Sequence, residues 1–173
     1  MSILTRYHNG HAIKRLCLTK ILQASQELVF EAWTNKKHLP HWWGPYGFSN
    51  PVCETDARPG GKLLIHMKAA DGLVFPMQGV YHQVHKPIMI MFSSLAFEDE
   101  EGYGGFENLN TVILTPYEGK TRLTLEALIV KASAEADAAL EGMEEGWKQS
   151  LEKLEEYLSS QSKINSKTSI WQR

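Results

Sequence analysis

Residues 30–61 read FEAWTNKKHLPHWWGPYGFSNPVCETDARPGG, and this stretch says more about the fold than any other part of the chain. It contains three tryptophans, four prolines and four glycines. Large aromatic side chains beside residues that turn the backbone are typical of a rigid, well-packed connector and not of a solvated loop. The corner at residues 42–45, WWGP, combines both features. We therefore predict a rigid, well-packed element at this position.

The sequence around this connector predicts one α+β domain. Before it, residues 14–22 form a strand pattern, and Ser25 is a suitable N-cap for a short helix that contains Trp33. Residues 35–43 predict a second short helix, which the following Gly-Pro pair ends. Further strands are expected at residues 52–56, 63–68, 77–84, 88–94, 110–115 and 121–130.

The last predicted element is a long amphipathic helix over residues 136–158. Its apolar stripe consists of Ala136, Leu140, Met143, Trp147, Leu151, Leu154 and Leu158. Such a stripe must be buried, and a helix of this length would span roughly 35 Å, enough to lie across an antiparallel sheet. The sequence thus predicts an N-terminal arm over residues 1–12, a single domain over 13–158 and a polar C-terminal tail over 159–173.

The bulk composition fits a soluble cytoplasmic domain. The chain has 173 residues, 43% of them hydrophobic, which is enough for one sizeable core. The net charge of -2 gives no electrostatic reason to expect nucleic acid or an anionic membrane as a partner. No apolar run is long enough to span a bilayer, and the N-terminus lacks the pattern of a secretory signal. Cys17 and Cys53 are too few for a disulfide framework, so a reducing compartment is predicted.

Several short motifs follow one another in an order that is known from one superfamily. They are FEAWT at 30–34, HL at 38–39, WWGP at 42–45, Asp56 with RPGG at 58–61, GVY at 79–81 and GMEEGW at 142–147. Over residues 16–158 the chain resembles the START-like (SRPBCC) superfamily, and within it the homologues of the C-terminal domain of the heat-shock protein 90 ATPase activator. The resemblance implies a helix-grip fold like that of the birch pollen allergen. In that fold a curved antiparallel sheet, here of about six or seven strands, wraps around the C-terminal helix.

The resemblance also implies a cavity between the sheet and the long helix, because the superfamily binds ligands there. Gly142 and Gly146 lie on one face of the predicted helix, and each costs about 1 kcal/mol relative to alanine. Their missing side chains either leave room for a ligand or let the helix pack closely on the sheet. Methionines and aromatic residues suit an adaptable apolar wall. The predicted ligand-binding residues are Trp43, Phe48, Ile65, Met67, Met77, Tyr81, Phe92, Met143, Gly146, Trp147 and Leu151.

The sequence carries no recognised catalytic or metal motif. It lacks the zinc spacings, the Gly-x-Ser-x-Gly elbow, the phosphate loop and the dinucleotide fingerprint. His38 and His41 are three residues apart, but no further ligand is nearby in sequence, so surface or capping roles are expected. Arg58 is expected to pair with a carboxylate such as Asp56 or Glu31. We assign no catalytic residue, metal or cofactor.

Three functions fit these observations. The first, which we favour, is a binding module for an apolar or aromatic small molecule such as a lipid, a flavonoid or a polyketide-like compound. The second is an enzyme of the cyclase or aromatase type, with Tyr81, Tyr103 and Glu107 as polar candidates in the cavity. The third is a co-regulator of the heat-shock protein 90 ATPase. The resembled activator uses a further N-terminal domain, and only a short segment precedes the first strand expected here. The sequence also leaves open whether the protein forms a homodimer, through an exposed sheet edge or through Trp171.

Overall fold

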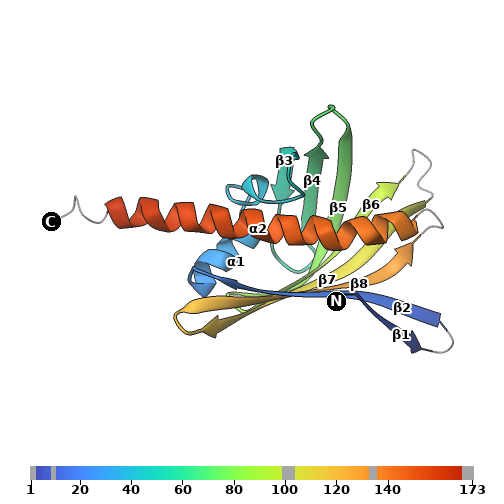
Figure 1. The fold of residues 1–173 in the computed structure, drawn as a ribbon, viewed down its shortest axis with the longest axis horizontal. Helices are drawn as coiled ribbons and strands as arrows, with labels where there is room; N and C mark the ends of the chain where they lie inside the picture. The colour runs from blue at the N-terminus through green and yellow to red at the C-terminus, as the bar shows by residue number, and fades with distance from the viewer. Residues whose placement is uncertain (1–2, 9–10, 99–103, 133–135, 169–173) are drawn as a thin grey trace.

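The computed structural model describes residues 3–8, 11–98, 104–132 and 136–168 (Figure 1). The strands are β1 (Ile3–His8), β2 (His11–Leu22), β3 (Ser49–Thr55), β4 (Lys62–Lys68), β5 (Val74–His85), β6 (Met89–Glu98), β7 (Gly104–Tyr117) and β8 (Lys120–Ala132). The helices are α1 (Gln26–Thr34), the 3₁₀ helix η1 (Leu39–His41) and α2 (Ala136–Thr168). Two short helices therefore follow the strand that ends at Leu22, as the sequence predicts.

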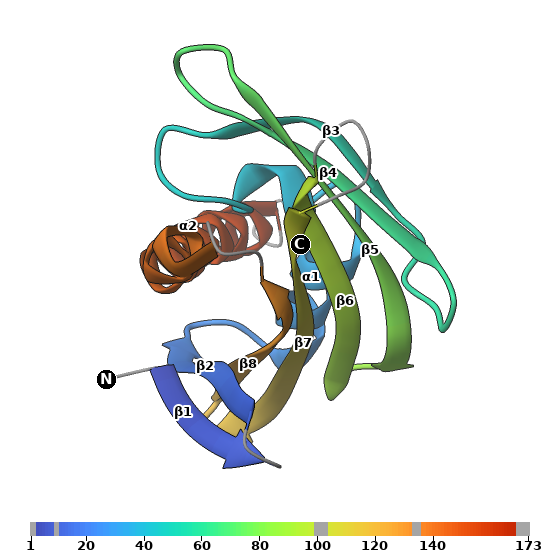
Figure 2. The same ribbon diagram turned by 90° about the vertical axis from the view of Figure 1, so that its right-hand side faces the viewer.

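The strands form one antiparallel sheet, with the order β1-β2-β8-β7-β6-β5-β4-β3. Figure 2 shows the sheet curving around α2, which lies along its concave side. The predicted helix-grip architecture is confirmed. In the described residues the sheet has eight strands, where the sequence predicts six or seven.

The ordered domain extends beyond the predicted bounds of 13–158 at both ends. Residues 3–8, expected to belong to an arm, pair with β2 from Ile3 opposite Leu16 to His8 opposite His11. At the other end α2 continues to Thr168 and projects past the sheet in Figure 1. Helix propagation adds one backbone hydrogen bond per residue, so a polar segment without Gly or Pro can continue a helix that packing has already nucleated.

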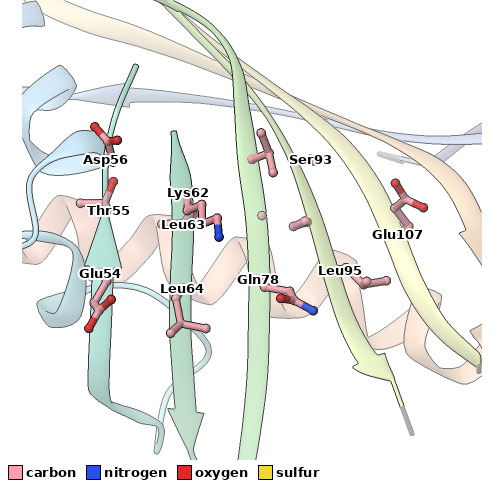
Figure 3. A pocket seen from close by; sticks show the side chains of 13 residues that line it. Glu54, Thr55, Asp56, Lys62, Leu63, Leu64, Gln78, Ser93, Leu95 and Glu107 are labelled. Carbon is pink, nitrogen blue, oxygen red and sulfur yellow. The ribbon is translucent and has the colours of Figure 1, made fainter. Parts of the chain in front are cut away.

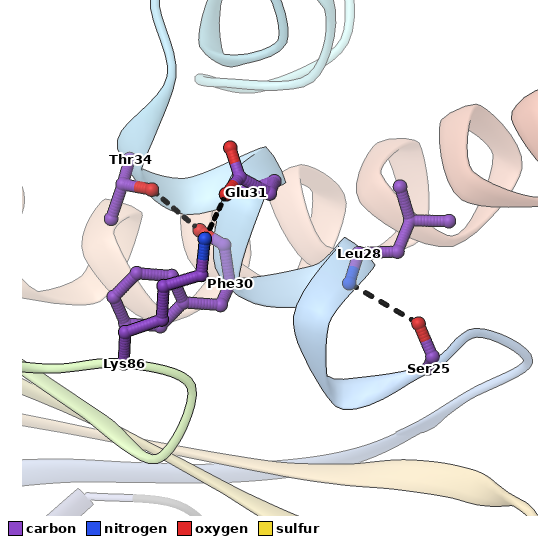
Figure 4. A network of polar contacts seen from close by, with 6 residues as sticks. All are labelled: Ser25, Leu28, Phe30, Glu31, Thr34 and Lys86. Atoms are coloured by element: carbon purple, nitrogen blue, oxygen red, sulfur yellow. Dashed lines mark hydrogen bonds and ion pairs between the residues drawn. The ribbon is translucent and has the colours of Figure 1, made fainter.

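The local signals of the sequence place α1 and the turns. The side chain of Ser25 accepts a hydrogen bond from the Leu28 amide at 3.3 Å, which caps α1 as predicted (Figure 4). Lys86, in the turn between β5 and β6, forms an ion pair with Glu31 of α1 at 2.5 Å. Arg58 pairs with Asp56 at 2.8 Å, so the two carboxylates considered for Arg58 have different partners.

The core lies between the concave sheet face and the helices, and aromatic rings fill its centre. Trp33 of α1 is 2% exposed and stacks on Trp147 of α2, with the ring centroids 5.9 Å apart. Trp42 is fully buried and donates its indole N–H to the carbonyl of Ala32 at 2.9 Å. The WWGP corner is thus the rigid, packed element that the sequence predicts. The C-terminal half of the α2 stripe, Leu151, Leu154 and Leu158, completes this core.

Candidate functional site

A cavity of about 310 Å³ remains between the sheet and the first part of α2. This volume is near the lower end of the range for small-molecule sites, about 300–1,000 Å³. The helix contributes Gly142, Met143, Gly146, Trp147 and Ser150 to its lining. The WWGP corner contributes residues 43–45, and strands β4 to β7 contribute Met67, Met77, Ser94, Ala96, Phe106 and Asn108. Most of the wall is therefore apolar, with a small polar group on the sheet side.

The two helix glycines open the α2 wall of this cavity. A Cβ atom built on Gly142 would meet no heavy atom of the described residues within 4 Å. A Cβ atom on Gly146 would lie 3.6 Å from Cγ of Pro45, an ordinary contact. Close packing therefore does not explain the glycine at 142, and the room it leaves faces open space. Gly142 is exposed, so the cavity reaches solvent on this side.

The WWGP corner is held against α2 by polar contacts to its carbonyl groups. Lys153 donates from Nζ to the carbonyls of Gly44 at 3.0 Å and of Trp43 and Pro45 at 3.4 Å. Burial of the ammonium lowers the pKa of Lys153 below its ordinary value. Asn50 donates a further hydrogen bond to the carbonyl of Trp43 at 2.8 Å. Because these bonds converge on backbone atoms, they fix one wall of the cavity.

The polar group on the sheet side comes from neighbouring strands. Ser94 of β6 lies directly opposite Asn108 of β7 in the register. Asn110, two residues further along β7, donates to Oγ of Ser94 at 2.9 Å. The Nδ2 atom of Asn108 reaches Sδ of Met143 at 3.6 Å, while its buried Oδ1 atom has no hydrogen-bond partner among the described residues. The sequence analysis did not identify these residues. Asn108 and Asn110 are two positions apart in a strand, so both side chains point to the same, core-facing side of the sheet.

Six of the eleven predicted wall residues line this cavity. They are Trp43, Met67, Met77, Met143, Gly146 and Trp147. The other five are placed elsewhere: Ile65, Tyr81, Phe92 and Leu151 are buried in the packed core, and Phe48 packs against Phe75 with the ring centroids 6.0 Å apart. Strand alternation identifies the inward face correctly, but the tryptophan cluster fills one part of the concave side.

Of the three polar residues considered for catalysis, the two that the structure describes do not line the cavity. Tyr81 is buried and shares a hydrogen bond with Oγ1 of Thr55 at 2.7 Å. Burial raises the pKa of Tyr81 to about 12. Glu107 lies on the opposite side of the sheet, and Tyr103 lies outside the described residues.

A second hollow, of about 630 Å³, lies on the sheet face that points away from α2 (Figure 3). Glu54, Lys62, Gln78 and Glu107 give it a mixed polar lining, to which Leu64 and Leu95 add apolar surface. Strands β5 and β6 approach each other closely here, so a Cβ atom on Gly79 would collide with the carbonyl oxygen of Ser93. Charges of both signs and a position on the open sheet surface make this hollow less suited to a small apolar molecule than the cavity under α2.

The paired histidines pack on the far part of α2. Nδ1 of His38 lies 2.6 Å from the hydroxyl of Tyr157, and the His41 ring stacks on the Tyr157 ring. Among the residues that the structure describes, no group of three or more His, Cys, Asp or Glu side chains is arranged to hold a metal ion. Within the same residues, no helix combines the length and the apolar character needed to cross a membrane.

Comparison with known proteins places the chain in a family. A family model described as activator of Hsp90 ATPase homolog 1-like protein matches residues 23–159. No curated protein matches the chain. The AHSA1 protein of Silicibacter pomeroyi is 26% identical and has a TM-score of 0.72, with 85% of this chain and 99% of that chain covered.

Other solved structures are similar to the same extent. A protein of Arthrobacter aurescens is 26% identical with a TM-score of 0.72, over 84% of this chain and 86% of that one. A protein of Nitrosomonas europaea, 24% identical with a TM-score of 0.72, shares the fold over 85% of this chain and 95% of its own. The fold of the chain over most of its length thus agrees with the family match. The chain belongs to the family of activator of Hsp90 ATPase homolog 1-like proteins, in the START-like (SRPBCC) superfamily.

Proposed function

We propose that this chain is a binding module that holds a small, mainly apolar molecule in the cavity between α2 and the sheet. One observation carries the proposal: Gly142 lies inside the long helix α2 at a point where a Cβ would meet no heavy atom of the described residues within 4 Å. A glycine in a helix interior costs about 1 kcal/mol relative to alanine. Since packing does not require it, the residue is best explained by the space it leaves in the wall.

The chemistry of the lining supports binding of an apolar body. Met67, Met77 and Met143 are flexible and polarizable side chains that adapt to varied guests. Trp43 of the WWGP corner and Trp147 of α2 add flat aromatic surface to the lining. Transfer of such a molecule from water contributes about 25 cal/mol for each Å² of apolar surface that is covered.

The same lining favours binding over acid–base catalysis. Its polar side chains are the hydroxyls of Ser94 and Ser150 and the amide of Asn108. These groups orient a ligand through hydrogen bonds, whereas general acid or base catalysis needs a group that exchanges a proton near neutral pH.

Thermal unfolding with a panel of lipids, flavonoids and polyketide-like aromatic compounds tests the proposal. A ligand present at a hundred times its Kd stabilises the folded state by about 2.7 kcal/mol. In a domain of this size that corresponds to a rise in Tm of about 5 °C or more. A panel that leaves the Tm unchanged would contradict the proposal.

A matched pair of variants shows whether the response comes from this cavity. Gly142→Leu places a side chain in the open wall, so it should abolish the ligand-induced shift while the ligand-free protein gains helix stability. Glu145→Leu adds the same side chain at an exposed position of the same helix and should retain the shift. Equal shifts in both variants would locate the binding site elsewhere.

A further inference from the structure

The amide of Asn108 is the least satisfied polar group of the cavity lining. The residue is 6% exposed, and its buried Oδ1 atom has no hydrogen-bond partner in the part of the chain that the structure describes. Its Nδ2 atom has only the weak sulfur acceptor of Met143, at 3.6 Å, across the gap between β7 and α2. A buried acceptor without a hydrogen bond destabilises the folded state, because it has lost its bonds to water and gained none in return. Asn108 lines the cavity, but its Oδ1 atom is not accessible to water as the side chain stands. A turn of the amide toward the open space would let a ligand donate a hydrogen bond to this atom and remove the penalty.

A hydroxyl that can donate lies next to this acceptor. Ser94 is directly opposite Asn108, and side chains in such pairs have Cβ atoms about 4.5–5.5 Å apart. Oγ of Ser94 accepts the hydrogen bond from Asn110, so its own proton remains to be donated. A turn of the Asn108 amide toward the open space would therefore place an acceptor beside the Ser94 donor in the cavity. A single ligand hydroxyl can donate to Asn108 and accept from Ser94.

The rest of the lining selects a neutral, aromatic partner for this pair. The described side chains that line the cavity carry no formal charge, so among them an ammonium or a carboxylate would be buried without a counterion. Methionine sulfur and tryptophan rings make favourable contacts with aromatic rings. Both features favour a flat ring system with one uncharged hydroxyl group.

We propose that the cavity binds small phenols, whose hydroxyl donates a hydrogen bond to Oδ1 of Asn108 and whose rings contact the methionine and tryptophan wall. This inference rests on the proposed binding function and specifies its ligand class. Three probes separate the two claims: 2-naphthol has the donor, 2-methoxynaphthalene keeps an acceptor but has no donor, and naphthalene has neither.

Calorimetric or fluorescence titration of the intact chain with each probe is the test. We expect 2-naphthol to bind about tenfold more tightly than 2-methoxynaphthalene, the factor that corresponds to one buried hydrogen bond of about 1.4 kcal/mol. In Asn108→Leu this preference should disappear while naphthalene still binds. Asn108→Ala, which adds no bulk, gives the same comparison without the risk of overpacking.

The outcomes distinguish the two claims. Equal affinities for 2-naphthol and 2-methoxynaphthalene, or a preference that survives in both Asn108 variants, would overturn the phenol assignment and leave an apolar binding site. If none of the three probes binds, the proposed function fails together with it.

Discussion

The ammonium nitrogen of Lys153 in α2 lies 3.0 Å from the carbonyl oxygen of Gly44 in the WWGP corner. The same nitrogen is 3.4 Å from the carbonyls of Trp43 and Pro45, so one side chain binds three consecutive backbone groups. These residues are far apart in sequence, and the contact fixes the corner against the helix at the edge of the cavity. It therefore links the stability of the fold to the shape of the candidate site.

Replacing Lys153 by methionine should destabilise the protein by about 1–3 kcal/mol, because the three carbonyls lose a charged donor in a partly buried position. Urea denaturation gives the change in the free energy of unfolding. Lys148→Met is the matched control, since Lys148 is exposed and its helical ion pair with Glu144 is screened by solvent and contributes little. Equal losses in the two variants would show that the carbonyl contacts of Lys153 do not matter.

The hydroxyl of Tyr81 makes the stability depend on pH in the alkaline range. Burial raises the pKa of Tyr81 from 10.0 to about 12 in the folded protein. Between these values the unfolded chain loses the proton and the folded chain keeps it, so the folded state becomes less stable as the pH rises. At pH 7 the group is neutral in both states and this effect is absent.

Tyr81→Phe removes this titration and also the 2.7 Å hydrogen bond to Thr55. The variant should be less stable than the parent by about 1 kcal/mol at pH 7. Above pH 10 its stability should fall less steeply, so that the difference between the two proteins shrinks or reverses by pH 11.5. Urea denaturation at the two pH values measures this, and parallel curves at all pH values would contradict the assigned pKa.

Much of the fold could be predicted because its signals are local. Ser25 caps α1 through a neighbouring amide, and Glu118 and Gly119 turn the chain with φ values of 48° and 76°. The apolar period of α2 likewise depends only on that segment. By contrast, β1 gains its structure from pairing with β2, and the last turns of α2 carry no apolar stripe, so neither feature has a distinctive local pattern.

The site was less predictable for the same physical reason. Alternation along β4 shows that Ile65 and Met67 share a face of the sheet. It does not show that Ile65 is buried in the core whereas Met67 lines a cavity. That difference depends on where Trp33 meets Trp147, a contact between distant elements. The buried asparagines could have been noticed, since polar side chains in an inward strand phase are uncommon and usually have a role.

Two glycines should respond in opposite ways to the same substitution. Gly79→Ala would push a methyl group into the carbonyl of Ser93, and relieving that overlap should destabilise the protein by about 1–3 kcal/mol. Gly142→Ala places its methyl group in open space and should stabilise the helix by about 1 kcal/mol. Thermal unfolding of the two variants compares them directly. A loss of stability in Gly142→Ala would mean that the wall at this point has no room.

Trp147 connects the packed core to the cavity, because its indole stacks on Trp33 and also lines the open space. Trp147→Ala should enlarge the cavity and cost about 3 kcal/mol, the lower end for such a truncation, since the side chain is only half-buried. The enlarged site should prefer aromatic ligands with one more fused ring, measured as the ratio of Kd values for two-ring and three-ring phenols. Trp147→Phe keeps an aromatic wall and should change the ratio less. An unchanged ratio in Trp147→Ala would show that the ligand does not reach this wall, and that the cavity under α2 is not where the molecule binds.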